Sequence, residues 1–272
     1  MTDHGIHCVE YSSEGPWLLL LHGVTRNRRD WEVVLPKLTK QWRVVAIDHS
    51  GHGQSRWTTD GYRVVDYAQA TTEFVQERFN EPITVLGHSL GAMVALWLAA
   101  KCPSLVSRAI LEDPPFHTMG NGIADTSYLA LFTGMQSVAR QRGDVDRMAN
   151  ALAEIRLPTP EGTVSLGEVR DRQSLRFSAE CIRELDPDIF SPLIASQWLD
   201  DFDHESLWSQ ATCPVLLLQG DATAGGTLTD ADLAIAKKQL TNFKCVSFNG
   251  VGHQIHSKCP ERFLKELEGF VR

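Results

Sequence analysis

Short apolar runs alternate with helix-like stretches along most of this chain, and the alternation limits what it can fold into. Most runs are uninterrupted, as expected of strands buried on both faces. They end at glycine, histidine or acidic residues and span 17–23, 43–53, 83–89, 108–115, 214–221 and 244–253. Helix-like patterns between them cover 66–79, 91–102, 230–240 and 260–271. This order predicts an α/β fold with a mostly parallel, doubly wound sheet that helices cover on both sides.

Residues 116–207 break this alternation. The segment lacks a clear strand and is predicted to form helices, divided by a loop at 156–168; the helices are 125–141, 144–155, 171–185 and 191–208. Ligand sites in such sheets lie beyond the carboxyl ends of the strands. We therefore expect two parts: a core of residues 1–115 and 208–272, and an inserted helical cap of residues 116–207 that covers the sheet's ligand-binding edge.

Composition and charge exclude several classes of protein. The net charge is −8, which argues against a nucleic-acid partner because phosphate binding favours a positive patch. No run approaches the roughly 20 apolar residues that span a bilayer. The first residues lack the basic start and apolar stretch of a signal peptide, so we expect a cytoplasmic protein without a membrane partner. The six cysteines are scattered without a C-x-x-C pair, so we expect no disulfide framework, metal site or cofactor.

A G-x-S-x-G motif at residues 87–91 supplies the candidate nucleophile, Ser89. The run "ITVLG" precedes the serine, and the helix-like "GAMVALWLAAKC" begins just after it. A serine on such a strand-to-helix turn is exposed, and the N-terminus of the helix faces the site. The motif alone occurs often by chance, but this context favours catalysis over a serine that merely caps the helix.

A serine hydroxyl needs a base to remove its proton, and His253 is the best placed of the ten histidines. It follows the last predicted strand in "NGVGHQIHSKCPERF", directly after a glycine. A nucleophile early in the chain and a histidine late in it is the order found in serine hydrolases built on such a sheet. His256 is the neighbouring alternative, but it lacks the flanking glycine and is expected on the descending loop.

Acyl transfer also requires two N–H groups directed at the developing oxyanion. The residue after the nucleophile, Leu90, supplies one candidate. The loop after "LLLLHG" supplies the other, the N–H of Val24. His22 is expected to shape this loop and not to react.

Five segments carry a resemblance to the α/β-hydrolase superfamily over almost the whole chain: "LLLLHGVTRNRRDW", "VVAIDHSGHGQS", "VLGHSLGAMVAL", "PVLLLQGD" and "GVGHQIHSKCPERF". The first resembles that family's oxyanion loop, the third its nucleophile elbow and the last its histidine loop. The resemblance implies a serine hydrolase with a helical cap, similar to an esterase or lactonase. Dehalogenases and epoxide hydrolases that resemble this chain have aspartate at the elbow, so Ser89 disfavours both.

The acid that would orient the histidine is the point where the chain departs from its relatives. Family members commonly carry an aspartate where this chain has Thr223. Asp221 lies two residues early and would require a reshaped loop, whereas Asp113 ends the preceding strand in "AILEDPPF". Some relatives, zearalenone lactonases among them, take their acid from that earlier strand end. We prefer Asp113, with Asp221 as the alternative, and expect Glu112 to point to the other side of its strand.

The predicted function is therefore hydrolysis of an ester or lactone of a small, largely apolar substrate through an acyl-enzyme. A carbon–carbon bond hydrolase with the same triad is an alternative. A ligand-binding member of the fold that has lost turnover is another, suggested by the missing aspartate at Thr223. The sequence does not predict the substrate or the oligomeric state.

A histidine pair and a short basic run resemble binding motifs, but each has a structural interpretation that we prefer. His49 and His52 are spaced like a metal-binding pair but lack further ligands, so we expect a turn that supports the site. The basic run at 26–29 is expected to be a solvated loop, and its alternative role is to face an acidic group of the substrate.

Overall fold

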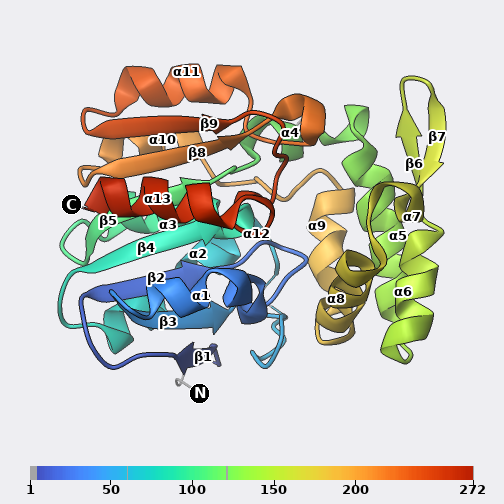
Figure 1. The fold of residues 1–272 in the computed structure, drawn as a ribbon, viewed down its shortest axis with the longest axis horizontal. Coiled ribbons are helices and arrows are strands. Elements are labelled where there is room, and N and C mark those ends of the chain that lie inside the picture. Colours follow the sequence, from blue (N-terminus) through green and yellow to red (C-terminus); the bar gives the residue numbers. More distant parts are fainter. Residues whose placement is uncertain (1–4, 60, 121, 272) are drawn as a thin grey trace.

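The computed structural model describes residues 5–59, 61–120 and 122–271, which form a seven-stranded sheet flanked by helices, with a smaller group of helices at one end (Figure 1). The strand order is β1-β3-β2-β4-β5-β8-β9, and only β1 runs antiparallel to its neighbour. The strands are β1 (His7–Glu10), β2 (Trp17–Leu21), β3 (Arg43–Asp48), β4 (Ile83–His88), β5 (Val106–Glu112), β8 (Val215–Gly220) and β9 (Phe243–Phe248). The α/β fold class and its mostly parallel sheet are confirmed. The edge strand β1 was not predicted from the sequence, because its half-buried residues form no apolar run.

Successive residues of the central strands enter two different cores, as the uninterrupted apolar runs predict. In β2, Leu18 and Leu20 pack into one core, and Leu19 and Leu21 pack into the other. All four side chains are fully buried. Because side chains alternate across a strand, a strand with helices on both faces needs apolar residues at every position.

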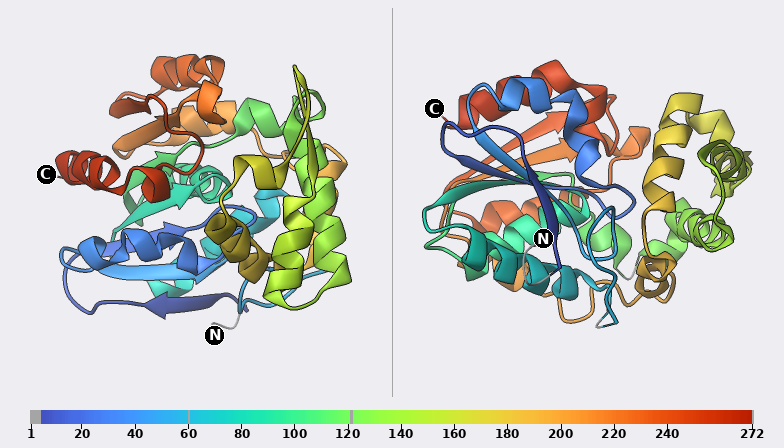
Figure 2. Two further views of the ribbon diagram at one scale, coloured as in Figure 1. Left: turned by 45° about the vertical axis from the view of Figure 1, so that its right-hand side comes forward. Right: turned by 90° about the horizontal axis from the view of Figure 1, so that it is seen from below.

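Helices cover both faces of the sheet, as Figures 1 and 2 show. On one face lie α1 (Leu35–Leu38), α12 (Ile255–Lys258) and α13 (Pro260–Val271). On the other lie α2 (Val64–Arg78), α3 (Leu90–Lys101), α10 (His204–Gln210) and α11 (Asp230–Gln239). Every predicted core helix is present to within two residues at each end.

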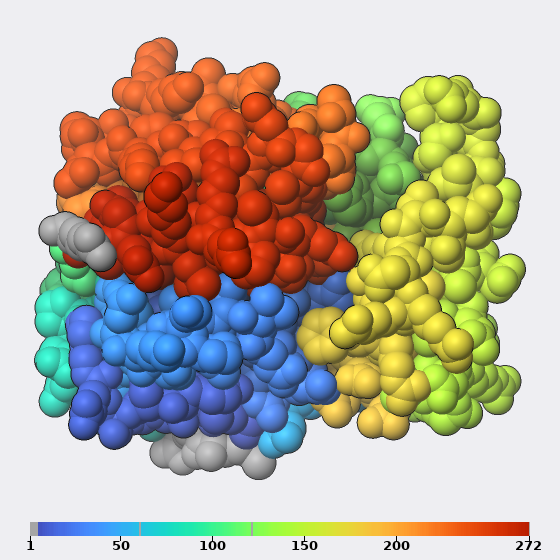
Figure 3. All heavy atoms as spheres, in the orientation of Figure 1, coloured from blue at the N-terminus to red at the C-terminus, as the bar shows by residue number. Residues whose placement is uncertain are grey.

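The segment after β5 forms this smaller group of helices, which we call the cap and which the space-filling view shows in green to yellow at one end of the molecule (Figure 3). Its helices are α4 (Phe116–Met119), α5 (Ser127–Gln141), α6 (Val145–Ala153), α7 (Leu166–Val169), α8 (Arg172–Arg183) and α9 (Ser191–Ile194). None of the described helices combines the length and the apolar character that a membrane-spanning segment requires.

The structure corrects two predictions within this segment. The predicted loop at 156–168 contains a hairpin of β6 (Arg156–Thr159) and β7 (Gly162–Ser165). Leu157 and Val164 face each other in it, and most other residues are exposed, so no apolar pattern marks these strands.

The predicted helix at 191–208 is also wrong. Positive φ angles at Ser196 (56°) and Asp201 (65°) interrupt it, because an α-helix cannot accommodate them. The chain resumes as α10, which packs on α3 of the core, so the expected boundary between residues 207 and 208 falls inside a core helix.

Candidate active site

Ser89 lies on a sharp turn between β4 and α3. Its backbone is in a strained region, with φ of 55° and ψ of −115°, and its N–H donates to the Glu112 carbonyl oxygen at 2.9 Å. The flanking glycines allow this turn, since a Cβ at Gly87 would collide with the Gly91 carbonyl, and a Cβ at Gly91 with the Leu21 carbonyl. A serine held in this way presents its hydroxyl above the carboxyl edge of the sheet.

His253 lies on the loop between β9 and α12, and its Nδ1 is 2.7 Å from Asp113 Oδ2. Asp113 follows β5 with a positive φ of 47°, and its side chain is fully buried. Its carboxylate also accepts backbone N–H groups from Gly220 (2.9 Å), Thr227 (2.8 Å) and Leu228 (3.2 Å). The structure therefore brings His253 together with Asp113, the preferred acid, and a carboxylate held by this many donors cannot turn away.

Asp221, the alternative acid, is engaged elsewhere. Its Oδ1 accepts the N–H and hydroxyl of Thr223 at 2.9 and 2.7 Å, and its Oδ2 accepts the N–H of Gly250 at 2.7 Å. These bonds hold a surface turn at the end of β8. No hydrogen bond or ion pair joins Asp221 to His253 among the described residues.

Thr227 is a site residue that the sequence did not reveal. Its hydroxyl lies 2.9 Å from Asp113 Oδ2 and 3.0 Å from His253 Nδ1, and the residue is buried. It follows the glycines of the β8–α11 loop, where no local pattern distinguishes it from an ordinary turn threonine. By contacting both members of the pair, Thr227 restricts the imidazole to the orientation in which Nδ1–H donates to Asp113.

The pKa values of the pair favour a charged acid and a neutral base. Burial alone would raise the pKa of Asp113, but hydrogen bonds from His253 and the backbone outweigh it and hold the pKa below its ordinary value. Burial lowers the pKa of His253 below 6.5, although the bond to Asp113 opposes this. At neutral pH, His253 therefore has a free Nε2 lone pair that can accept a proton.

The two predicted oxyanion donors carry free N–H groups. Neither the Val24 nor the Leu90 N–H donates to another group in the described part of the chain. The Gly23 carbonyl accepts from His22 Nδ1 at 2.8 Å and from the Arg26 N–H at 3.0 Å. Because this carbonyl and the Val24 N–H belong to one trans peptide, they point in opposite directions, so holding the carbonyl also orients the N–H.

His22, His49 and His52 form the support for this loop. His22 is buried, and burial lowers its pKa to about 4, so it is neutral at physiological pH. Its Nε2 accepts the N–H of His49 at 3.0 Å, while His52 Nε2 lies 2.6 Å from the Val24 carbonyl oxygen. The expectation that His22 is structural and that the pair His49 and His52 supports the turn is confirmed.

His256 lies on α12, and not on a loop as predicted, and it is fully buried away from the cavity. Its Nδ1 lies 2.9 Å from both carboxylate oxygens of Glu112, and its Nε2 lies 3.7 Å from Asp30 Oδ2. These two carboxylates outweigh burial and raise the pKa of His256 to about 10, so it is a buried cation. Glu112 points to the opposite side of β5 from Asp113, as expected.

Asp30, His88 and His256 are also the group of described residues whose geometry comes nearest to a metal site, with ligand atoms within 4.8 Å of one another. A metal ligand must be deprotonated, whereas His256 is protonated between two carboxylates. Burial would raise the pKa of Asp30, but His256 outweighs burial and holds this pKa well below its usual range. The cluster therefore fits an ion-pair network beneath the site better than it fits a metal ion.

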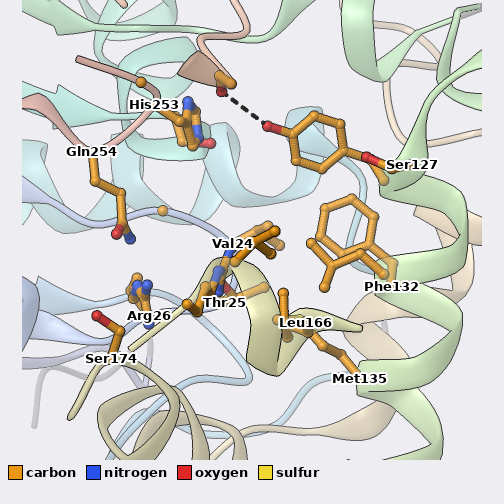
Figure 4. A pocket seen from close by; sticks show the side chains of 18 of the residues that line it. Val24, Thr25, Arg26, Ser127, Phe132, Met135, Leu166, Ser174, His253 and Gln254 are labelled. Atoms are coloured by element: carbon orange, nitrogen blue, oxygen red, sulfur yellow. Dashed lines mark hydrogen bonds between the residues drawn. The ribbon is translucent and has the colours of Figure 1, made fainter. Parts of the chain in front are cut away.

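Ser89 and His253 open into one cavity of about 380 Å³ between the sheet edge and the cap. This volume suits a small molecule. Apolar cap side chains form much of the wall, namely Met119, Leu131, Phe132, Met135, Leu166 and Trp198. Figure 4 shows Phe132 and Met135 on one side and Arg26, Ser174 and Gln254 on the other. Arg26 is buried, so the prediction of a solvated basic loop is wrong for this residue.

Comparison with known proteins agrees with this geometry. Residues 16–257 match the family model for the alpha/beta hydrolase fold, so the chain belongs to this family. It is 26% identical over 270 residues to a 2-(acetamidomethylene)succinate hydrolase of Mesorhizobium japonicum, covering 97% of this chain and 90% of that protein. It is 27% identical over 262 residues to a pimeloyl-[acyl-carrier protein] methyl ester esterase of Nitrosomonas europaea, covering 94% and 96%.

A solved structure shows the same fold. The crystal structure of E-2-(acetamidomethylene)succinate hydrolase superimposes with a TM-score of 0.75 at 23% sequence identity, covering 99% of this chain and 97% of that one.

Proposed function

We propose that this protein is a serine hydrolase that cleaves an ester or lactone of a small substrate through an acyl-enzyme formed on Ser89. The observation that carries the proposal is the 2.7 Å contact between His253 Nδ1 and Asp113, on a histidine that shares the cavity with Ser89. A base with its tautomer set by a buried carboxylate is what activation of a serine hydroxyl requires.

In this mechanism, His253 Nε2 takes the proton from the Ser89 hydroxyl as its oxygen attacks the carbonyl carbon. The N–H groups of Val24 and Leu90 stabilise the oxyanion. The imidazolium, stabilised by Asp113, then protonates the leaving oxygen, and an acyl-enzyme remains. Water, activated by the same histidine, releases the acid and restores the serine.

Membership of the hydrolase family and two relatives of nearly full coverage, a hydrolase and a methyl ester esterase, support hydrolysis as the reaction class. The contact between Asp113 and His253 argues against a non-catalytic binding protein, because the histidine has an acid partner although residue 223 is a threonine. Hydrolysis of a carbon–carbon bond would use the same residues. Substrate panels separate that alternative from ester cleavage.

Labelling by an uncharged fluorophosphonate tests the nucleophile. We expect the folded protein to be labelled on Ser89, with labelling abolished by Ser89→Ala. Ser174→Ala is the matched control, because Ser174 lines the same cavity but its hydroxyl donates to Asp171 at 2.9 Å. Mass spectrometry of the labelled peptide identifies the residue. The proposal is contradicted if the folded native protein is not labelled, or if the Ser89→Ala variant is labelled to the same extent as the native protein.

The pH dependence of kcat/KM tests the base. Only neutral His253 accepts a proton, so activity should fall as pH decreases through its pKa, which burial lowers below 6.5. We therefore expect an acid limb with its midpoint on the acidic side of 6.5 and a plateau through neutral pH. The measurement uses ester hydrolysis between about pH 4.5 and 8, where a carboxylate-free substrate does not itself titrate. A midpoint above 6.5 would mean that Asp113 outweighs burial.

A further inference from the structure

Four charged side chains line the cavity besides its histidines, and two of them pair with each other. Lys258 Nζ lies 3.7 Å from Asp171 Oδ2, and both side chains are more than half exposed. Asp171 also accepts the N–H and hydroxyl of Ser174, at 2.8 and 2.9 Å. This pair therefore neutralises itself at the surface and leaves two arginines, Arg26 and Arg170.

Arg26 is held in the wall by several partners. Its Nη1 donates to Ser178 Oγ at 2.9 Å, and its Nε lies 3.5 Å from Asp30 Oδ1. When the Gln254 amide is turned so that its oxygen faces Arg26, that oxygen accepts from Nε at 2.9 Å. The charge of Arg26 is thus compensated within the protein.

Arg170 has no such compensation. It connects α7 to α8, and its backbone N–H donates to the Leu166 carbonyl at 2.9 Å. Within the described ranges, its guanidinium forms no ion pair and no side-chain hydrogen bond, although its side chain lines the cavity. Burial, and then the like charge of Arg26, lower the pKa of Arg170 to about 10, so it remains a cation at neutral pH.

Arg170 is thus a partly buried cation at the cavity wall with no counter-ion among the described residues, which is unfavourable unless a bound group supplies the negative charge. Removing a guanidinium from bulk water costs free energy, and nearby positive charge adds to that cost. An anion bound beside Arg170 would recover this free energy, and the flat, forked guanidinium matches a carboxylate in two parallel hydrogen bonds.

We propose that the cavity binds a substrate carrying a carboxylate, which pairs with Arg170 while the carbonyl to be cleaved lies against Ser89. The inference rests on the proposed function, because it assigns the substrate class of that site. A single carboxylate on the substrate is enough to balance the charge of the Arg170 guanidinium. The apolar wall around Phe132 and Met135 then contacts the chain between the carboxylate and the reacting carbonyl.

Two 4-nitrophenyl esters test this directly: the half-ester of glutaric acid, which ends in a carboxylate, and the pentanoate, which ends in a methyl group. We expect the native protein to prefer the glutarate ester in kcat/KM. Arg170→Gln should lose about 10- to 100-fold of that preference, the scale of a charged hydrogen bond, chiefly through KM. Arg170→Lys keeps the positive charge and should retain part of the preference for the glutarate ester.

Arg172→Gln is the matched control. Arg172 lies two residues away, is exposed and is not part of the cavity wall, so its loss changes the net charge equally. The glutarate preference should survive this change. The inference is wrong if the native protein does not prefer the glutarate ester, or if Arg170→Gln keeps that preference. In either case, labelling of Ser89 would still support a serine hydrolase.

Binding without turnover separates the two proposals. Free glutarate should raise the melting temperature of Ser89→Ala, and it should not raise that of Ser89→Ala with Arg170→Gln. If this stabilisation depends on Arg170 while the native protein hydrolyses neither ester, the result would support the carboxylate site and contradict ester hydrolysis. No stabilisation of Ser89→Ala by glutarate at millimolar concentration would contradict the carboxylate site.

Discussion

Replacing Asp113 with asparagine should reduce kcat by about 10⁴-fold, the loss seen when the acid of a serine triad is made an amide. Oδ2 of Asp113 accepts from Thr227 N–H and faces His253 Nδ1. An amide nitrogen at that position would present a proton to Nδ1 and favour the tautomer with hydrogen on Nε2. His253 could then no longer accept the Ser89 proton, although Oδ1 would still accept from Gly220 and Leu228 and preserve the loop.

Asp221→Asn is the matched comparison, since it makes the same chemical change in the neighbouring loop. Its bonds to Thr223 and Gly250 stabilise an exposed turn, so kcat should change little. Both variants are compared by steady-state hydrolysis, with circular dichroism and melting temperature as checks on folding. If Asp221→Asn were the inactive variant and Asp113→Asn remained active, the assignment of the acid would be wrong.

Replacing His256 with glutamine should destabilise the fold by about 3–5 kcal/mol, the usual cost of removing one member of a buried ion pair. The change leaves the carboxylates of Glu112 and Asp30 without the cation that lies between them. For a chain of this size, a loss on that scale lowers the melting temperature by roughly 6–20 °C. The intact protein at neutral pH provides the reference.

The pH dependence of this stabilisation has a definite sign. The pKa of His256 is raised in the folded state to about 10, from an ordinary 6.5. Its contribution is therefore complete below pH 6.5 and is lost as pH rises toward 10. The difference in melting temperature between the native protein and His256→Gln should narrow over this range.

Two further variants isolate the ion pair. The double variant Glu112→Gln with His256→Gln should recover part of the lost stability, because it removes an unpaired charge along with its partner. His117→Gln is a control at an exposed histidine and should have little effect. A melting temperature of His256→Gln within about 2 °C of the native value would show that the network contributes little to stability.

Local sequence was sufficient for the parts of the site that lie within a few residues of a strand end. Ser89 and its glycines sit on one strand-to-helix turn, and a Cβ at Gly87 would collide with the Gly91 carbonyl of the same motif. The core strands could also be predicted from local sequence, because burial on both faces requires apolar residues at consecutive positions. The hairpin of the cap was missed because its strands are mostly exposed and carry almost no apolar pattern.

By itself the sequence determined the fold class, the turn that holds Ser89 and a short set of polar residues at the strand ends. Only the tertiary structure decided which of them meet. Asp113 and His253 are 140 positions apart, and Asp221 was the closer candidate along the chain. The same holds for Thr227, for the cation His256 and for the unpaired Arg170. Contacts of this kind depend on distances between different strands and loops, and on the charges that burial places side by side, which no local pattern of residues records.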